Sequence, residues 1–289
     1  MSAPVPLRQR LARILRGRLA ANLLAIYVAR AANIIMPLAL IPIMARTLDP
    51  AVFALTLVGQ AIGLWVSQLV EYGYDFSATR RLAREDWSGQ GWKQIVADTL
   101  GGQTLLAVLC LFGVAGFFIL IEGFQGHPAI LLLAWVYGAS AGAIPRWYYY
   151  AREELALYTT VIVLGRALGV VLSVLGALLL ASGEMVMLGY AVGSLIGFAW
   201  TLRTILPKLK GSRWSVTGSL STLREGTGVF VFKLSKMFYS LGGVTAAGLF
   251  APVAAVAQYA AADRLVRAGI NLAVSFTLAL FPRLARLVE

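Results

Sequence analysis

The 289-residue sequence has little of what enzymes use for chemistry. Cys110 is its only cysteine and His127 its only histidine, so these residues cannot form an intramolecular disulfide, a thiol metal centre or a multi-histidine site. His127 lies beside Pro128 in a short polar gap and is interpreted as a loop residue. The sequence has no GxxxxGK[ST] motif, so ATP-driven chemistry has no support. We therefore expect no metal, no cofactor, no catalytic residue and no enzyme activity.

Charged residues are also scarce, and acidic residues are the scarcer kind. Only 13% of the residues are charged, with 13 acidic against 25 basic, whereas 59% are hydrophobic and the mean hydropathy is +0.78. A soluble domain of this length would not tolerate so apolar a surface, so the composition indicates a membrane protein. The basic residues cluster in short gaps between apolar runs, which favours a role in membrane orientation over nucleic-acid binding.

Eight apolar stretches are long enough to cross a bilayer, which requires about 20 residues of helix. None of them shows the alternating pattern of a barrel strand, so the predicted fold is all-α, a polytopic helical bundle. The predicted spans are residues 21–45, 51–71, 95–121, 129–150, 156–181, 185–206, 227–250 and 256–281.

The gaps between these spans differ sharply in charge. Eighteen of the 25 basic residues, Arg146 among them, lie in the terminal segments and in alternate gaps, whereas the opposite gaps contain only Arg46. This bias predicts that both termini are cytoplasmic and that the first span is an uncleaved helix. Within the spans, glycines recur at four-residue spacing, which predicts close helix packing; examples are Gly59 and Gly63, and Gly138 and Gly142.

Six basic residues fall inside predicted spans: Arg30, Arg166, Lys233, Lys236, Arg264 and Arg267. A charge near the bilayer centre costs at least about 2.5 to 3.5 kcal/mol, so it usually faces a cavity, a partner or a substrate. Helical spacing also places polar neighbours beside two of these arginines. Asn33 shares a face with Arg30, and Asn271 shares one with Arg264.

The excess of cations over acids within the spans predicts a cavity for a phosphate or diphosphate, which the planar donors of arginine suit. The candidate substrate-binding residues are Arg30, Asn33, Arg166, Lys233, Arg264, Arg267 and Asn271. In the alternative interpretation, Lys233, Lys236 and Arg30 extend to the cytoplasmic interface instead.

Two acidic residues are candidates for ion pairing or for coupling to an ion. Asp263 can pair with Arg267 at i+4 or carry a coupling proton. Glu71 lies at the cytoplasmic end of its predicted span, where it can pair with a cation at the mouth of the cavity.

Three segments together resemble one protein family. They are EYGYDFSATRRLAR at residues 71–84, IPRWYYYAREELALYT at 144–159, and residues 223–286, which end in FPRLAR. In this order they resemble the Wzx-type oligosaccharide flippases of bacterial surface-polysaccharide synthesis, part of the multidrug/oligosaccharidyl-lipid/polysaccharide exporter superfamily. The residues that carry the family motifs are Ser77, Thr79, Arg80, Pro145, Trp147 and Glu153.

The resemblance implies two six-helix lobes that face a central cavity and alternate in access. It divides the chain into a cytoplasmic N-terminus (1–20), a six-helix lobe (21–206), a cytoplasmic linker (207–226) and the first two helices of a second lobe (227–289). Because the family has twelve or more helices, we expect the sequence to be a fragment; the alternative is a shortened relative that pairs with another chain.

The function that the resemblance implies is the flipping of undecaprenyl-diphosphate-linked oligosaccharide across the bacterial inner membrane, for lipopolysaccharide or other surface polysaccharide. The expected partners are this substrate, the bilayer and other polysaccharide-assembly membrane proteins. Trp147, Tyr148 and Tyr149 either stack on sugar rings or form an interfacial aromatic belt.

Three alternatives to the flippase remain open. A multidrug exporter of the same superfamily would need buried carboxylates to bind cationic drugs, and the charge bias here is the reverse. A membrane-embedded transferase or polymerase would be expected to carry a sizeable extramembrane domain. A scaffold subunit without transport activity is the third alternative.

Overall fold

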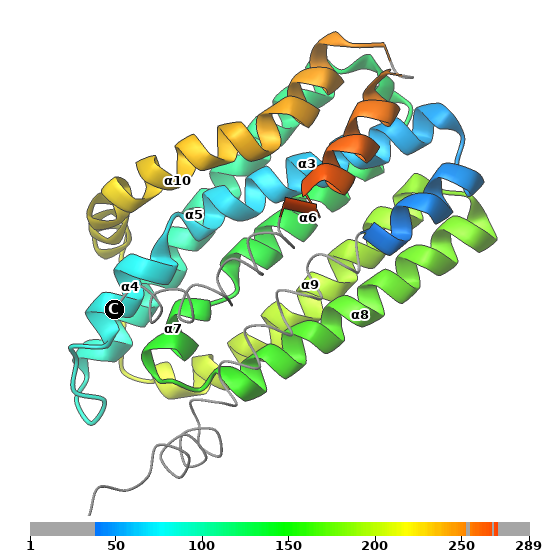
Figure 1. Cartoon of the computed structure of the whole chain (residues 1–289). Coiled ribbons are helices and arrows are strands. Elements are labelled where there is room, and N and C mark those ends of the chain that lie inside the picture. Colours follow the sequence, from blue (N-terminus) through cyan, green and yellow to red (C-terminus); the bar gives the residue numbers. More distant parts are fainter. Residues whose placement is uncertain (1–37, 253–254, 268, 271–289) are drawn as a thin grey trace, which may run out of the picture.

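The computed structural model describes residues 38–252, 255–267 and 269–270, which are helical apart from turns and short connections (Figure 1). No strand occurs among these described residues. The helices are Leu38–Thr47, α3 (Pro50–Glu71), α4 (Tyr74–Leu82), α5 (Gly91–Leu120), η1 (Glu122–Gln125), α6 (Pro128–Ala143), α7 (Arg146–Ala151), α8 (Leu155–Leu180), α9 (Gly183–Ile205), η2 (Leu206–Leu209), α10 (Val216–Phe250) and residues 255–267.

Local sequence signals explain where several helices begin. The side chain of Asp49 accepts a hydrogen bond from the backbone N–H of Ala51 at 2.9 Å, and Pro50 occupies the first position of α3. Ser182 caps α9 in the same way, and Ser215 accepts from the N–H of Gly218 at 2.9 Å to start α10. These caps satisfy backbone donors that the first helical turn leaves unpaired.

The structure confirms the predicted spans between residues 51 and 206. Five described helices are long and apolar enough to cross a membrane: Pro50–Leu82, Gly91–Leu120, Pro128–Ala151, Tyr158–Leu180 and Gly183–Leu209. The predicted first and eighth spans lie partly outside the described residues. The seventh, 227–250, lies within α10, which begins at Val216 inside the predicted linker because Ser215 caps it there and no proline interrupts it afterwards.

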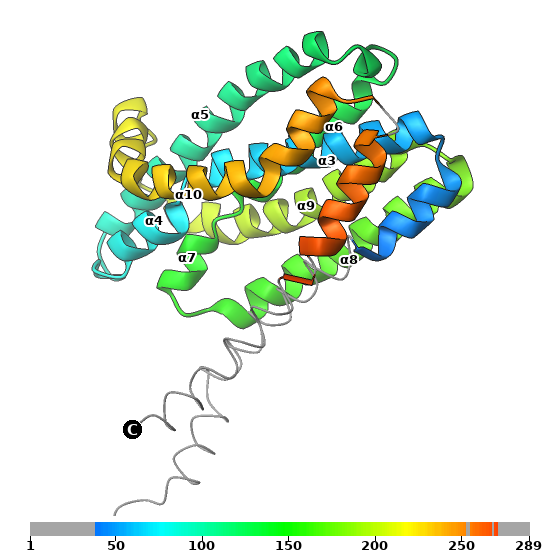
Figure 2. The ribbon, with the colours of Figure 1, turned by 45° about the horizontal axis from the view of Figure 1, so that its top comes forward.

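Close backbone contacts join these helices into one bundle. Helix α8 packs along α9, α6 packs between α3 and α9, and α10 runs along α5 and α3 (Figure 1). A Cβ built on Gly138 of α6 would lie 2.3 Å from the carbonyl oxygen of Gly63 in α3, so only glycine permits this approach. The helix of residues 255–267 folds back from the end of α10 toward the middle of the bundle (Figure 1, Figure 2).

Large apolar side chains cover the outside of the bundle. Phe112 and Ile119 of α5 are 71% and 74% exposed, and Leu179 of α8 is 74% exposed. Water would not tolerate so continuous an apolar surface, whereas lipid tails would. Together with the five long apolar helices, these faces identify an all-α, multi-pass membrane protein.

The connections between the long helices gather at two ends of the bundle. At one end α4 packs against α5, α7 and α10, and η2 packs against α5; we call this the α4–α7 end. At the other end His127, just before α6, contacts Glu184 in the first turn of α9 at 2.5 Å (Nδ1 to Oε1). His127 is thus more than a plain loop residue, because it ties the connection before α6 to α9.

The Gly138 contact gives a first testable prediction. Substituting Gly138→Ala inserts a methyl group where no space exists, and overpacking of this kind costs about 1 to 3 kcal/mol. We expect a lower melting temperature for the detergent-solubilised chain, measured as the folded fraction that elutes from size exclusion after heating. Gly116→Ala in α5 is the matched control, because nothing lies within 4 Å of a Cβ there. Equal destabilisation by both substitutions would contradict the packing argument.

Candidate functional site

A buried carboxylate lies at the α4–α7 end of the bundle. Glu71, the last residue of α3, is 4% exposed. Its Oε2 atom accepts from Nη2 of Arg146 in α7 at 2.9 Å, and its Oε1 atom accepts from Nζ of Lys233 in α10. One carboxylate therefore joins three helices, and two cations compensate its removal from water.

A break in the chain directly after Glu71 positions a second acid. Tyr72 and Gly73 both adopt left-handed backbone conformations, with φ of 51° and 91°. This conformation ends α3 and starts α4 in a new direction, and the Cβ that Gly73 lacks would meet Cγ1 of Val229 at 2.8 Å. Asp75 then falls in the first turn of α4, where a negative charge favours the helix dipole.

Asp75 completes a group of four charged residues. Its Oδ2 atom lies 3.5 Å from Nε of Arg146, which is an ion-pair distance but longer than a good hydrogen bond. We call Glu71, Asp75, Arg146 and Lys233 the charged junction. It contains two acids and two bases, so its formal charge is zero when all four are ionised.

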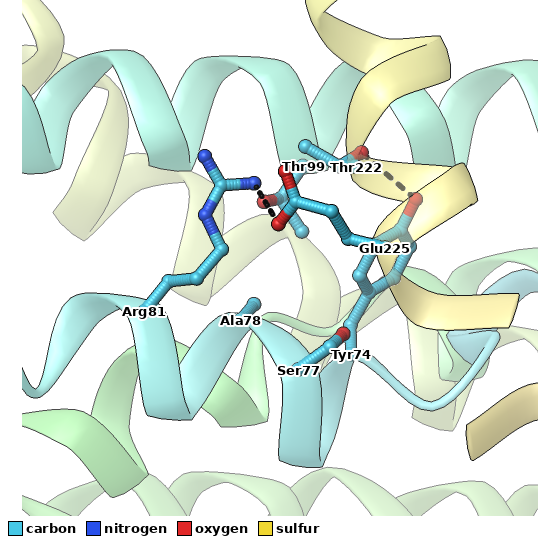
Figure 3. Close-up of a pocket in the computed structure, with 7 residues that line it drawn as sticks. All are labelled: Tyr74, Ser77, Ala78, Arg81, Thr99, Thr222 and Glu225. Atoms are coloured by element: carbon cyan, nitrogen blue, oxygen red, sulfur yellow. Dashed lines mark hydrogen bonds and ion pairs between the residues drawn. The ribbon is translucent and has the colours of Figure 1, made fainter. Parts of the chain in front are cut away.

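A second contact ties α4 to α10 beside the charged junction. Arg81 Nη1 lies 3.0 Å from Oε2 of Glu225, and the Tyr74 hydroxyl lies 3.2 Å from that of Thr222. Figure 3 shows both pairs around a shallow pocket between α4, α5 and α10. The Arg81 and Glu225 side chains are 32% and 46% exposed, so water screens their attraction.

A second polar group lies deeper in the bundle. It consists of Tyr137 of α6, Arg166 of α8, Tyr190 of α9 and Arg264 of the 255–267 helix, which we call the arginine–tyrosine cluster. The rings of Tyr137 and Tyr190 meet edge to face with centroids 5.4 Å apart, and Tyr137 lies within electrostatic range of both arginines. Four helices thus bring two cations and two phenols together.

Two donors of this cluster have no partner. Among the described residues, Nη1 of Arg264 and the hydroxyl oxygen of Tyr190 are buried and make no hydrogen bond. A buried donor without an acceptor costs about 1 to 3 kcal/mol, and more for a charged group. The cluster is therefore incomplete as it stands, and an anion with several acceptor oxygens would complete it.

Electrostatic contacts connect the two polar groups. Arg166 lies within range of Tyr158 and of Arg146 in the charged junction, and Tyr158 lies within range of Asp75. Polar residues therefore extend from the α4–α7 end into the middle of an otherwise apolar bundle.

The structure separates the candidate residues that the sequence grouped. Arg166 and Arg264 come together in the arginine–tyrosine cluster. Lys233 pairs with Glu71 in the charged junction instead. Glu71 has the cation partner that the sequence predicts. Arg30, Asn33 and Asn271 lie outside the described residues.

The predicted ion pair between Asp263 and Arg267 is present. Nε and Nη2 of Arg267 donate to the two carboxylate oxygens of Asp263 at 2.6 and 2.7 Å. Two parallel hydrogen bonds of this kind fix both side chains along one helix face. The contact supports the pairing interpretation of Asp263.

Residues of the family motifs join two segments of the chain. Thr79 of α4 donates its hydroxyl to the backbone oxygen of Trp147 in α7 at 3.2 Å, and Trp147 is fully buried. Ser77 donates back to the carbonyl of Gly73 at 3.4 Å and so supports the turn before α4. The contact of Thr79 with Trp147 holds α4 against α7, and Ser77 supports the turn before α4, so these residues help to position Asp75 and Arg146.

The other motif residues lie around the same contact. Pro145 is buried and directly precedes α7, where its ring restricts the backbone before Arg146. Glu153 adopts a left-handed φ of 55° in the turn between α7 and α8. Arg80 is exposed on α4.

Both interpretations of the aromatic run 147–149 require correction. Trp147, Tyr148 and Tyr149 are 0%, 0% and 5% exposed. Tyr149 stacks on Tyr158 with centroids 4.9 Å apart, and Tyr148 packs edge-on against Trp87 at 5.8 Å. Because the rings face other aromatic residues, they are available neither to a sugar nor to lipid headgroups.

Four of the functional candidates are not evident from the sequence. Arg146 counts as a gap charge there, because it follows an apolar span and precedes an aromatic run. Asp75, Tyr137 and Tyr190 carry no spacing signal, because each is an isolated acid or tyrosine in an apolar sequence. The proline directly before Arg146 was the one available sign that the chain re-enters the bundle at that point.

Comparison with known proteins places the chain in a family. A family model described as polysaccharide biosynthesis protein matches residues 19–288. The chain belongs to the polysaccharide biosynthesis protein family. This agrees with the resemblance that the three sequence segments show.

Two curated relatives of this family member carry the name "Putative O-antigen transporter". The protein from Shigella dysenteriae is 25% identical over 276 residues, which cover 92% of this chain and 67% of the relative. The protein from Escherichia coli (strain K12) is 24% identical over 269 residues, which cover 91% and 64%. The chain thus spans about two thirds of the length of these relatives. No solved structure matches the chain significantly.

The charged junction gives a second prediction. Glu71→Gln removes the acid that compensates Arg146 and Lys233, and the loss of one partner from a buried ion pair costs about 3 to 5 kcal/mol. We expect a large fall in the melting temperature of the purified chain. Glu225→Gln, which breaks the exposed pair with Arg81, serves as the control and should cost about 0 to 1 kcal/mol. If both variants melt at the same temperature, Glu71 does not hold the helices together.

Proposed function

We propose that this protein moves a lipid-linked oligosaccharide, carried on undecaprenyl diphosphate, across the bacterial inner membrane for surface-polysaccharide synthesis. The family match and the two relatives named as O-antigen transporters support this proposal at the level of pathway and transport. The role is non-enzymatic, because the chain translocates its substrate without altering a covalent bond.

The observation that carries the proposal is the arginine–tyrosine cluster. A diphosphate offers several acceptor oxygens, and the planar donors of arginine suit it well. Within this cluster, Nη1 of Arg264 and the hydroxyl of Tyr190 are buried donors that have no acceptor among the described residues. An anion that accepts from both would remove the cost of leaving them unpaired.

The proposed mechanism is alternating access. The polyprenyl tail stays in lipid beside the bundle, while the diphosphate and its sugars pass along the polar interior. Arg166 and Arg264 hold the diphosphate, and Arg30, Asn33 and Asn271 remain candidates for the same role. The substrate moves when the helices around the cluster rearrange and open it to the other side.

We assign the α4–α7 end to the cytoplasm, with both chain termini on that side. Connections rich in lysine and arginine stay cytoplasmic during insertion, and the basic connections that the sequence identifies include α4, α7 and the segment around η2. The charged junction then lies near the cytoplasmic entrance.

We further propose that residues 21–206 form the first lobe of the transporter and that the second lobe begins with α10. In this arrangement the ion pair between Glu71 and Lys233 crosses from one lobe to the other. Arg264, which follows α10 in the chain, belongs to the second lobe and faces Tyr137 and Tyr190 of the first.

The charge of the interior favours an anionic substrate over the cationic drugs of a multidrug exporter. Glu71 and Asp263 both pair with cations in the described part of the bundle. A drug cation would have to displace an arginine or a lysine from them. A diphosphate, in contrast, meets Arg264, whose Nη1 has no acceptor among the described residues.

Substitution of Arg264 tests the function. We expect Arg264→Ala, introduced at the chromosomal locus, to abolish surface polysaccharide and to trap the lipid-linked oligosaccharide on the cytoplasmic side. A hydrogen bond to a charged group contributes about 1.5 to 3 kcal/mol, which corresponds to a loss of affinity of about tenfold or more. The polysaccharide is measured by gel electrophoresis, at protein levels matched by immunoblot.

Two variants act as controls for this test. Arg264→Lys keeps the charge but not the planar fork, so we expect partial export. Arg203→Ala removes an exposed cation from the last turn of α9 and should leave export unchanged. Normal export with Arg264→Ala at an equal protein level would overturn the assignment of the cluster.

A further inference from the structure

The two acids of the charged junction meet the same guanidinium. Oε2 of Glu71 lies 2.9 Å from Nη2 of Arg146, and Oδ2 of Asp75 lies 3.5 Å from its Nε. Two ionised carboxylates held around one guanidinium repel each other, and neither can donate a hydrogen bond. A proton on one of them removes the repulsion and supplies the missing donor, as in other sites where two carboxyl groups meet.

The donors around the pair are distributed unevenly. Glu71 receives both Nη2 of Arg146 and Nζ of Lys233, so its ionised form is well supported. Asp75 has only Nε of Arg146, at 3.5 Å. Its Oδ1 atom is buried, and no donor among the described residues reaches it. Asp75 is therefore the member of the pair on which a proton is the more stable.

We propose that Asp75 and Glu71 share one proton and form a proton-binding site at the α4–α7 end. Arg146 of α7 and Lys233 of α10 contact the pair, and Tyr150 of α7 and Tyr158 of α8 lie within electrostatic range of Asp75. The two tyrosines stay neutral across the physiological range, so the proton alone changes the charge of the charged junction. With the proton bound the formal charge is +1, and without it the charge is zero.

This site has a consequence for transport that rests on the proposed function. An anionic diphosphate near the charged junction binds more tightly when the net charge there is positive. By linkage, the bound diphosphate raises the affinity of the pair for its proton to the same degree. A rise in pH removes the proton and weakens binding, and a fall in pH restores it.

Infrared spectroscopy of the purified chain tests the proton directly. A protonated carboxyl group absorbs at a C=O stretching frequency where carboxylates do not. We expect such a band at neutral pH in the wild-type protein, and its loss in Asp75→Asn. Asp263→Asn is the matched control, because Asp263 accepts two hydrogen bonds from Arg267, so the band should persist.

Isotope labelling keeps the test decisive if Asp75→Asn fails to fold. Aspartate labelled with ¹³C at its side-chain carboxyl shifts the band in the wild-type protein only if an aspartate carries the proton. Asp75 is the expected source among the five aspartates of the chain, since Asp49 and Asp86 are exposed, Asp98 accepts from Gln94 at 3.0 Å and Asp263 is ion-paired. A band that is absent, unshifted by the label or lost only in Asp263→Asn overturns the proposal.

A binding measurement tests the linkage separately. Geranyl diphosphate, a soluble lipid diphosphate, is titrated into wild type and Asp75→Asn between pH 6 and pH 8. As the pH rises, we expect the affinity of the wild type for the probe to fall more steeply than that of the variant. The amide introduced by Asp75→Asn is uncharged at every pH in this range and so mimics the protonated aspartate. The probe also titrates, but this effect is the same for both proteins. Equal slopes overturn the linkage. No binding by either protein, with the infrared band present, supports the proton site and counts against the proposed function.

Discussion

The ionised carboxylate of Glu71 sets the constraint on which this arrangement depends. A charge at the end of a membrane helix can leave water only if cations meet it, and the two cations here come from elements far apart in the sequence, Arg146 from α7 and Lys233 from α10. The contact therefore fixes the position of α10 relative to α3. The left-handed turn after Glu71, the docking of Thr79 on Trp147 and the buried proline before Arg146 all keep these charges at bonding distance.

The interior of the bundle consequently has one part in which acidic and basic residues match and another part in which they do not. At the α4–α7 end acids and bases match, and their mutual contacts hold helices together. In the middle, Arg166 lies within electrostatic range of Tyr137 and Tyr158, and Arg264 lies within range of Tyr137, Tyr190 and Asp263. Nη1 of Arg264 has no acceptor among the described residues. A group in which acidic and basic side chains pair stabilises the fold, whereas buried cationic donors without acceptors favour the binding of an anion. The distinction could not be made by counting charges along the sequence, because both parts contain arginine and differ in the residues that pack around it.

The sequence alone predicted the features that depend on composition and regular spacing. Hydropathy located the five central helices, glycine spacing indicated their close packing, and i+4 spacing predicted the pair of Asp263 with Arg267. It failed where the chain changes direction. Helix α7 is a six-residue segment between two breaks, so no periodic signal showed that Arg146 points back toward Glu71. The burial of the aromatic run was missed for the same reason, since burial in α7 depends on contacts with α4, α5 and α8.

The length of α10 adds a mechanical consequence. Its 35 residues rise about 1.5 Å each, which gives a path of about 52 Å along the helix, well beyond the roughly 30 Å thickness of the hydrocarbon core. The helix bends along its course instead of forming a straight rod (Figure 1, Figure 2). Lys233 lies near its midpoint and pairs with Glu71, so the middle of α10 is fixed to α3. The polar turns near Ser215 and the apolar turns near Phe250 therefore lie on opposite sides of one anchored point.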